Sequence, residues 1–169
     1  MILTQAQVDE RKAVLRRFRE LLEAQRAKFR EYLDVLEKQG RVIADENTEA
    51  IFAHTELEQH IVGSIVTLQK AIQPIEAMYH AIIAPSGGLK ADAIAGDNDA
   101  SSPPIPALQT DLENLQKQVL ERNEKNRELL KTRLTQIKHQ LNTFYNPYHS
   151  KSVYAASAEQ TASLVQIDA

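Results

Sequence analysis

The chain has 169 residues, a formal net charge of -3, 43% hydrophobic but only 5% aromatic residues, and no cysteine. The absence of cysteine excludes a disulfide scaffold, a thiol nucleophile and a cysteine metal site, and no segment carries the strong basic stripe that nucleic-acid binding requires. No apolar run is long enough to span a bilayer, and the N-terminal pattern is not that of a signal peptide. A composition rich in charged residues, Leu, Ala and Gln predicts one domain of long helices, an all-α antiparallel bundle over residues 1–145.

The first predicted helix covers residues 4–39. Thr4 can cap its start, and Gln7 three residues later completes a capping box. Gly40 predicts its end, because glycine readily adopts the left-handed conformation of a helix C-cap. Apolar residues with heptad spacing predict the buried face: Val8, Val14, Leu15, Phe18, Leu21, Leu22, Phe29, Tyr32, Val35 and Leu36.

The second predicted helix covers residues 45–83 and begins near Asp45 or Asn47, which are both good caps. Its apolar residues alternate by four and three, as in a coiled-coil seam: Ile61, Ile65, Leu68, Ile72, Ile75, Tyr79 and Ile82. Pro74 lies inside this pattern and removes one backbone hydrogen bond. Since the apolar phase continues beyond Pro74, the sequence predicts a bend in the helix and not a break.

A linker is predicted over residues 84–107, where turn-forming residues dominate, with a short helical turn around Leu89 to Ile94. The third helix is predicted over residues 108–145, with Thr110 and Glu113 as a capping box. Two apolar stripes follow it, separated by an eleven-residue step that acts as a stutter: Leu108, Leu112, Leu115 and Val119, then Leu130, Leu134, Ile137, Leu141 and Phe144.

Polar residues occupy the expected seam between the two stripes, at Arg122, Asn123 and Asn126. One interpretation is that the seam rotates out to solvent at the stutter. The other is that these residues act as a polar selector in a partner groove, because one buried polar position can fix the register of paired helices.

The sequence contains no convincing catalytic or metal-binding pattern. Glu56 with His60, and Glu76 with His80, have a four-residue spacing that can hold a metal, but such pairs are more often solvated helix pairs. His54 falls on the apolar phase of its helix and is predicted to be a partly buried packing residue. Neither a phosphate-binding glycine loop nor a nucleophile elbow is present. We therefore expect no enzyme activity and no cofactor.

A polar tail over residues 146–169 follows the last helix. Asn146-Pro147-Tyr148 closes the helix, and Ser152-Val153-Tyr154 with Gln160-Thr161 follows in a segment too poor in apolar residues to build a core. Exposed aromatics on such a segment are candidates for docking. The tail resembles the C-terminal end of the FlgN family of flagellar export chaperones, with Ala155 and Ala158 where the family has glycines. The layout of three long helices with a variable linker before the third is also similar.

The resemblance implies a cytoplasmic chaperone that binds the C-terminal segments of flagellar hook-associated proteins, prevents their premature assembly and delivers them to the type III export gate. It also implies that Val153 and Tyr154 dock to that gate. The alternative for Tyr154 is that its ring folds back onto the bundle.

The third helix has more apolar width than a three-helix core needs, so an exposed patch is predicted. We expect a client groove along this helix, with the first helix as its second wall. Its candidate anchors are Leu120, Leu129, Leu130, Leu134 and Ile137.

The competing hypothesis is a non-enzymatic coiled-coil adaptor or self-assembling structural protein, in which the extra apolar face is a seam between copies. Sedimentation distinguishes the two hypotheses. An adaptor is expected to be a stable oligomer at micromolar concentration, whereas a chaperone alone is expected to be a monomer or a weak homodimer.

Overall fold

The computed structural model describes residues 4–84 and 103–145. These residues form three α-helices in chain order, α1 (Gln5–Ala44), α2 (Thr48–Ile83) and α4 (Ile105–Tyr145), and contain no strand. The predicted all-α helical class is confirmed. The chain divides into two compact units, residues 1–129 and 130–169, so that α4 contributes its first part to one unit and its last part to the other.

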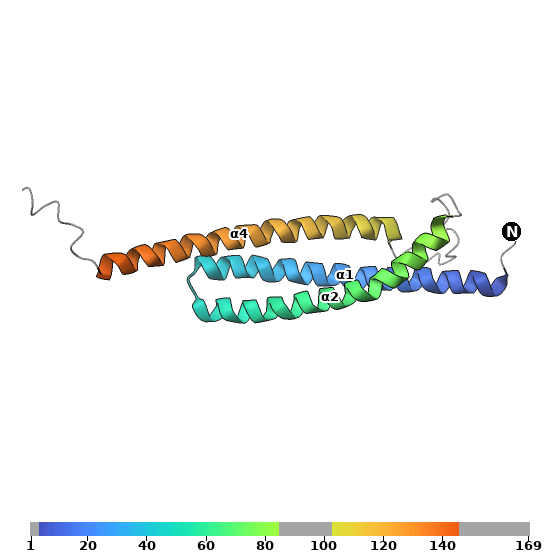
Figure 1. Ribbon diagram of the computed structural model, residues 1–169, viewed down its shortest axis with the longest axis horizontal. Coiled ribbons are helices and arrows are strands. Elements are labelled where there is room, and N and C mark those ends of the chain that lie inside the picture. The colour runs from blue at the N-terminus through green and yellow to red at the C-terminus, as the bar shows by residue number, and fades with distance from the viewer. Residues whose placement is uncertain (1–3, 85–102, 146–169) are drawn as a thin grey trace, which may run out of the picture. The chain divides into compact units, whose positions relative to one another are not determined.

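Helices α1 and α2 form an antiparallel hairpin in the first unit (Figure 1). The capping box at the start of α1 is confirmed, because the Thr4 backbone N–H donates to Gln7 Oε1 at 3.0 Å. At the start of α2, Asn47 is the cap, and its side chain accepts a hydrogen bond from the Ala50 backbone N–H at 3.0 Å. The sequence therefore determines both helix starts through local hydrogen bonds.

The prediction that Gly40 ends the first helix is wrong, because α1 continues to Ala44. The left-handed residue of the turn is Glu46, with a φ of 59°. The backbone N–H groups of Glu46 and Asn47 donate to the carbonyls of Ile43 and Val42, which closes the helix end as a glycine would. Continuation of the helix through Gly40 also buries Ile43, which is only 1% exposed.

Helix α2 passes through Pro74 without interruption, which confirms a bend and not a break. In Figure 1 the second half of α2 turns away from the line of its first half. The lost backbone hydrogen bond at a proline lets a helix bend at that point.

The prediction that the third helix starts at about residue 108 with Thr110 in a capping box is also wrong, since α4 begins at Ile105. Thr110 lies within the helix, where its hydroxyl donates to the Pro106 carbonyl at 3.0 Å. Pro106 is tolerated in the first turn because its missing N–H has no partner there in any helix. The earlier start buries Ile105, which extends the apolar stripe by one turn. The predicted helical turn at Leu89 to Ile94 lies outside the described residues.

The core of the first unit is built from all three helices. It includes most positions of the predicted faces, with a ring contact between Phe18 and Tyr79 at a centroid distance of 4.7 Å. Val8 and Val14 are half-buried, as are Leu68, Ile75 and Leu115 at its edge. The buried residues of this core cluster are Leu15, Phe18, Leu21, Leu22, Phe29, Tyr32, Val35, Leu36, Ile61, Ile65, Ile72, Tyr79, Ile105, Leu108, Leu112 and Val119.

Candidate functional site

The three polar residues on the seam of α4, Arg122, Asn123 and Asn126, each form a hydrogen bond with α1 in the first unit. Asn126 is only 3% exposed, and its side-chain N–H group donates to the Leu36 carbonyl at 2.8 Å and to Gln39 Oε1 at 3.1 Å. Both sequence interpretations of Asn126 are therefore wrong, because the residue is neither turned to solvent nor placed in a partner groove. Buried hydrogen bonds of this kind fix how two helices are aligned.

Gly40 explains why α1 can approach Asn126 so closely. A Cβ atom at Gly40 would lie 2.8 Å from Asn126 Oδ1, which is too close for any contact without a shift. Asn126 cannot turn away freely, since its amide is held by Leu36 and Gln39. The glycine that the sequence suggested as a helix end is thus a packing residue inside the helix.

A pair of glycine substitutions tests this explanation. We expect Gly63→Ala to raise the free energy of unfolding by about 1 kcal/mol, because nothing lies within 4 Å of a Cβ there and alanine is the better helix former. Gly40→Ala should instead lower it by about 1–2 kcal/mol, since overpacking outweighs the gain in helix propensity. Chemical denaturation measures both. In an Asn126→Ala background the cost of Gly40→Ala should vanish, and equal stabilisation at both glycines in the parent would contradict the close approach.

A second set of polar contacts surrounds Tyr32. Its hydroxyl donates to Glu58 Oε1 at 2.8 Å and accepts a hydrogen bond from the Asn123 side chain at 2.9 Å. Gln39 donates to the other carboxylate oxygen of Glu58 at 3.2 Å. Burial, and then the hydrogen bond to Glu58, raise the pKa of Tyr32 to about 12. These contacts join all three helices of the first unit.

The raised pKa of Tyr32 predicts a loss of stability in alkali. A pKa that is higher in the folded chain than the usual value of 10.0 contributes stability below pH 10 that is lost between about pH 10 and 12. In that window the melting temperature of the parent should fall more steeply than that of Tyr32→Phe. Tyr145→Phe is the control, since Tyr145 is 85% exposed, and it should follow the parent. Parallel curves for the parent and Tyr32→Phe would contradict the assignment.

The last part of α4, in the second unit, exposes a continuous apolar face. Leu130 is 42% exposed, Leu134 53% and Ile137 52%, and the same stripe continues through Leu141 to Phe144, which is 83% exposed. Spacings of four and three place all five on one side of the helix. We call these five residues the C-terminal seam. Leu141 and Phe144 belong to the predicted stripe but were missing from the predicted anchors, although their spacing alone would have included them.

Leu120 and Leu129, the other two predicted anchors, lie in the first unit. They are 69% and 40% exposed, so neither is needed for the core. We also predicted that the first helix forms the second wall of the client groove. Helix α1 and the C-terminal seam belong to different units, so this stays a prediction. Val153 and Tyr154, the predicted gate-docking residues, lie outside the described residues.

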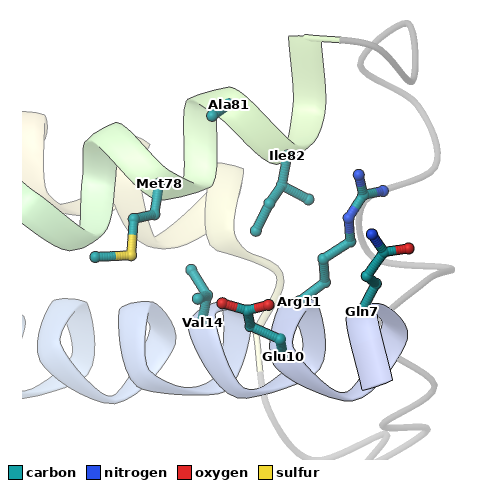
Figure 2. A pocket seen from close by; sticks show the side chains of 7 residues that line it. All are labelled: Gln7, Glu10, Arg11, Val14, Met78, Ala81 and Ile82. Atoms are coloured by element: carbon teal, nitrogen blue, oxygen red, sulfur yellow. The ribbon is translucent and has the colours of Figure 1, made fainter. Parts of the chain in front are cut away.

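A pocket of ≈ 360 Å³ lies between the beginning of α1 and the end of α2. In Figure 2, Met78 and Ile82 point from α2 toward α1, and Val14 points back toward α2. Gln7, Glu10 and Arg11 supply its polar side chains, and Ala81 completes the lining. None of the described residues that line this pocket is Ser, Thr, Cys, Lys or His, so these residues supply no paired nucleophile and base.

Helix α2 contains three histidines, of which His60 and His80 are exposed. His80 lies 3.9 Å from Glu76 with both side chains well exposed, as in a solvated helix pair, and His54 is half-buried. In residues 4–84 and 103–145, no group of three or more His, Cys, Asp or Glu side chains is placed to hold a metal ion. Within the same ranges, no helix has both the length and the apolar content of a membrane span.

The chain is an all-helical protein with one exposed heptad face, and such a face is suited to pairing with another helix. The chain belongs to the FlgN family, since the family model described as FlgN protein matches residues 14–162. Members of this family are chaperones of flagellar protein export, which places the chain in flagellum biogenesis.

One relative is an uncharacterized protein of Treponema pallidum (strain Nichols). It is 33% identical over 138 residues, which cover 82% of this chain and 79% of that protein. No solved structure matches the chain.

Proposed function

We propose that this chain is a cytoplasmic export chaperone that binds the C-terminal amphipathic helices of flagellar hook-associated proteins. It prevents their premature assembly and delivers them to the cytoplasmic domain of the type III export gate. The observation that carries the proposal is the C-terminal seam, five apolar residues exposed along one face of α4. Membership of the FlgN family supports the flagellar context.

The chemistry of client and chaperone is complementary. An amphipathic helix that assembles only at its destination has an apolar face without a partner during transport, and this face would drive self-association. A helix with an exposed heptad stripe can cover that face as one helix pairs with another. The client must become ordered when it binds, and this cost keeps the affinity moderate and allows release.

Delivery to the gate is assigned to a separate part of the chain. The family match extends to residue 162 and so includes Val153 and Tyr154. A docking residue in the tail leaves the C-terminal seam available, so that client and gate can bind at the same time. This division predicts that the two affinities are changed by different substitutions.

Complex formation with a purified hook-associated protein tests the proposal. Mixing it with the full chain should give a stoichiometric heterocomplex in sedimentation, and removal of the C-terminal helical segment of the client should abolish that complex. The control is a hook-associated protein shortened at its other end, which should still bind. A contradictory result would be a homo-oligomer of the chain that is stable at micromolar concentration and does not bind the client. This result would support the structural-adaptor alternative.

A further inference from the structure

The charges beside the C-terminal seam all have one sign. In heptad terms Leu134 and Leu141 take the a positions, while Leu130, Ile137 and Phe144 take the d positions. The flanking e and g positions then hold Lys131, Arg133, Lys138, Gln140 and Tyr145. Every charged residue that flanks the seam is therefore basic.

Residues 130–145 contain no Asp or Glu, so this part of the helix carries only positive charges. Glu128 is the last Asp or Glu before Tyr145, whereas the earlier part of α4 contains five: Asp111, Glu113, Glu121, Glu124 and Glu128. The helix dipole favours cations near a C-terminus, but only within the last turn. Lys131 and Arg133 lie three turns or more before Tyr145, so the dipole does not account for them.

A second copy of the chain is a poor occupant for the seam. In a parallel pair, Arg133 of one copy would face Lys138 of the other, since a g position meets the e position of the following heptad. In an antiparallel pair, e positions meet e positions and g positions meet g positions, so Lys131 of one copy would face Lys138 of the other while Arg133 would face Gln140. Both arrangements bring like charges together beside the apolar contact, and like charges at these positions disfavour pairing.

We propose that the C-terminal seam selects an amphipathic partner helix that carries Asp or Glu at the positions flanking its apolar stripe. This inference rests on the proposed function in taking the seam as the client surface, and it adds the charge that the client helix must have. Such a helix gains ion pairs at e and g along two heptads, whereas a basic helix of the same apolar content meets repulsion. Charges at these positions determine partner choice and association rate more than total affinity.

Two synthetic helices that share Leu and Ile at a and d but differ at e and g test the inference. The acidic probe has Glu at these positions and the basic probe has Lys. Titrated against the full chain at low salt, the acidic probe should bind at least roughly ten-fold more tightly. The difference should shrink at high salt, because the pairs are exposed and screened.

Charge reversal provides the matched comparison. The triple variant Lys131→Glu, Arg133→Glu, Lys138→Glu should bind the basic probe more tightly than the acidic one. The control is Lys70→Glu, Lys117→Glu, Lys125→Glu, which makes the same change in net charge at three exposed positions of the first unit. It should keep the preference of the parent, and circular dichroism checks that both variants retain their helices.

Several results would overturn the inference. These are equal binding of the two probes, no binding of either, a preference that survives the triple reversal, or a homodimer that the acidic probe does not dissociate. The proposed function is judged separately, by the complex with the hook-associated protein. If that client binds while the probes are not distinguished, only the charge selection fails. If the acidic probe is preferred while no hook-associated protein binds, the proposed function fails.

Discussion

Replacing Leu134 and Ile137 together by serine should weaken binding of a hook-associated C-terminal segment by about 100-fold or more. The two side chains occupy adjacent a and d positions at the centre of the C-terminal seam. Loss of two apolar anchors from a helix interface removes about 3 kcal/mol or more, which corresponds to this factor. Since both side chains are about half exposed in the free chain, the melting temperature should hardly change. Isothermal titration and thermal denaturation measure the two quantities.

The matched control removes a similar exposed apolar area from another helix. Leu57 and Val66 on α2 are each 44% exposed, and Leu57→Ser with Val66→Ser should leave client affinity unchanged. The pair Leu120→Ser and Leu129→Ser tests how far the client surface extends along α4. If the Leu134 and Ile137 variant binds the client as the parent does, the groove lies elsewhere. A large fall in its melting temperature would mean that the seam is packed within the chain.

Tyr154→Ala should weaken binding to the isolated cytoplasmic domain of the export gate by about 2 kcal/mol or more, as expected for an aromatic hot spot. Tyr154 lies seven residues beyond Pro147, and small residues around it, such as Ala155, let a pocket close over the ring. Client affinity and melting temperature should stay almost unchanged, because Tyr154 follows Phe144, the last residue of the seam, by ten residues and belongs to none of the predicted anchors. Titration against the gate domain, with and without client, measures the effect.

Tyr148→Ala is the matched control for this experiment, since it removes the same ring from the same tail outside the Val153-Tyr154 pair. It should keep the gate affinity of the parent. Equal gate affinity for Tyr154→Ala and the parent would contradict the docking role. A large loss of thermal stability in Tyr154→Ala would favour the alternative in which the ring folds back onto the bundle.

Local patterns in the sequence predicted much of the helical architecture. Thr4 with Gln7, and Asn47 with Ala50, form caps through hydrogen bonds between residues three apart, so no distant part of the chain is needed. The heptad spacing of α1 and α2 likewise predicted their buried faces, because a side chain's direction on a helix follows from its position. The bend at Pro74 could also be predicted, because the loss of a backbone hydrogen bond is a local property of proline.

The errors in the sequence predictions arose where a residue has more than one role. Gly40 matched a helix end, but no local sequence pattern reveals that it packs against the side-chain amide of Asn126 on another helix. Thr110 matched a helix start, but burial of Ile105 favoured a start five residues earlier. In both cases a contact between helices outweighed a local preference of about 1 kcal/mol.

The sequence by itself determined where the helices form, which face of each is apolar and which charges flank that face. Only the tertiary structure decided which apolar face is covered. The stripe from Leu108 to Val119 is buried in the core, whereas the stripe from Leu130 to Phe144 has the same spacing and remains exposed. Periodicity fixes the side of a helix on which apolar residues lie, but burial depends on what packs against that side.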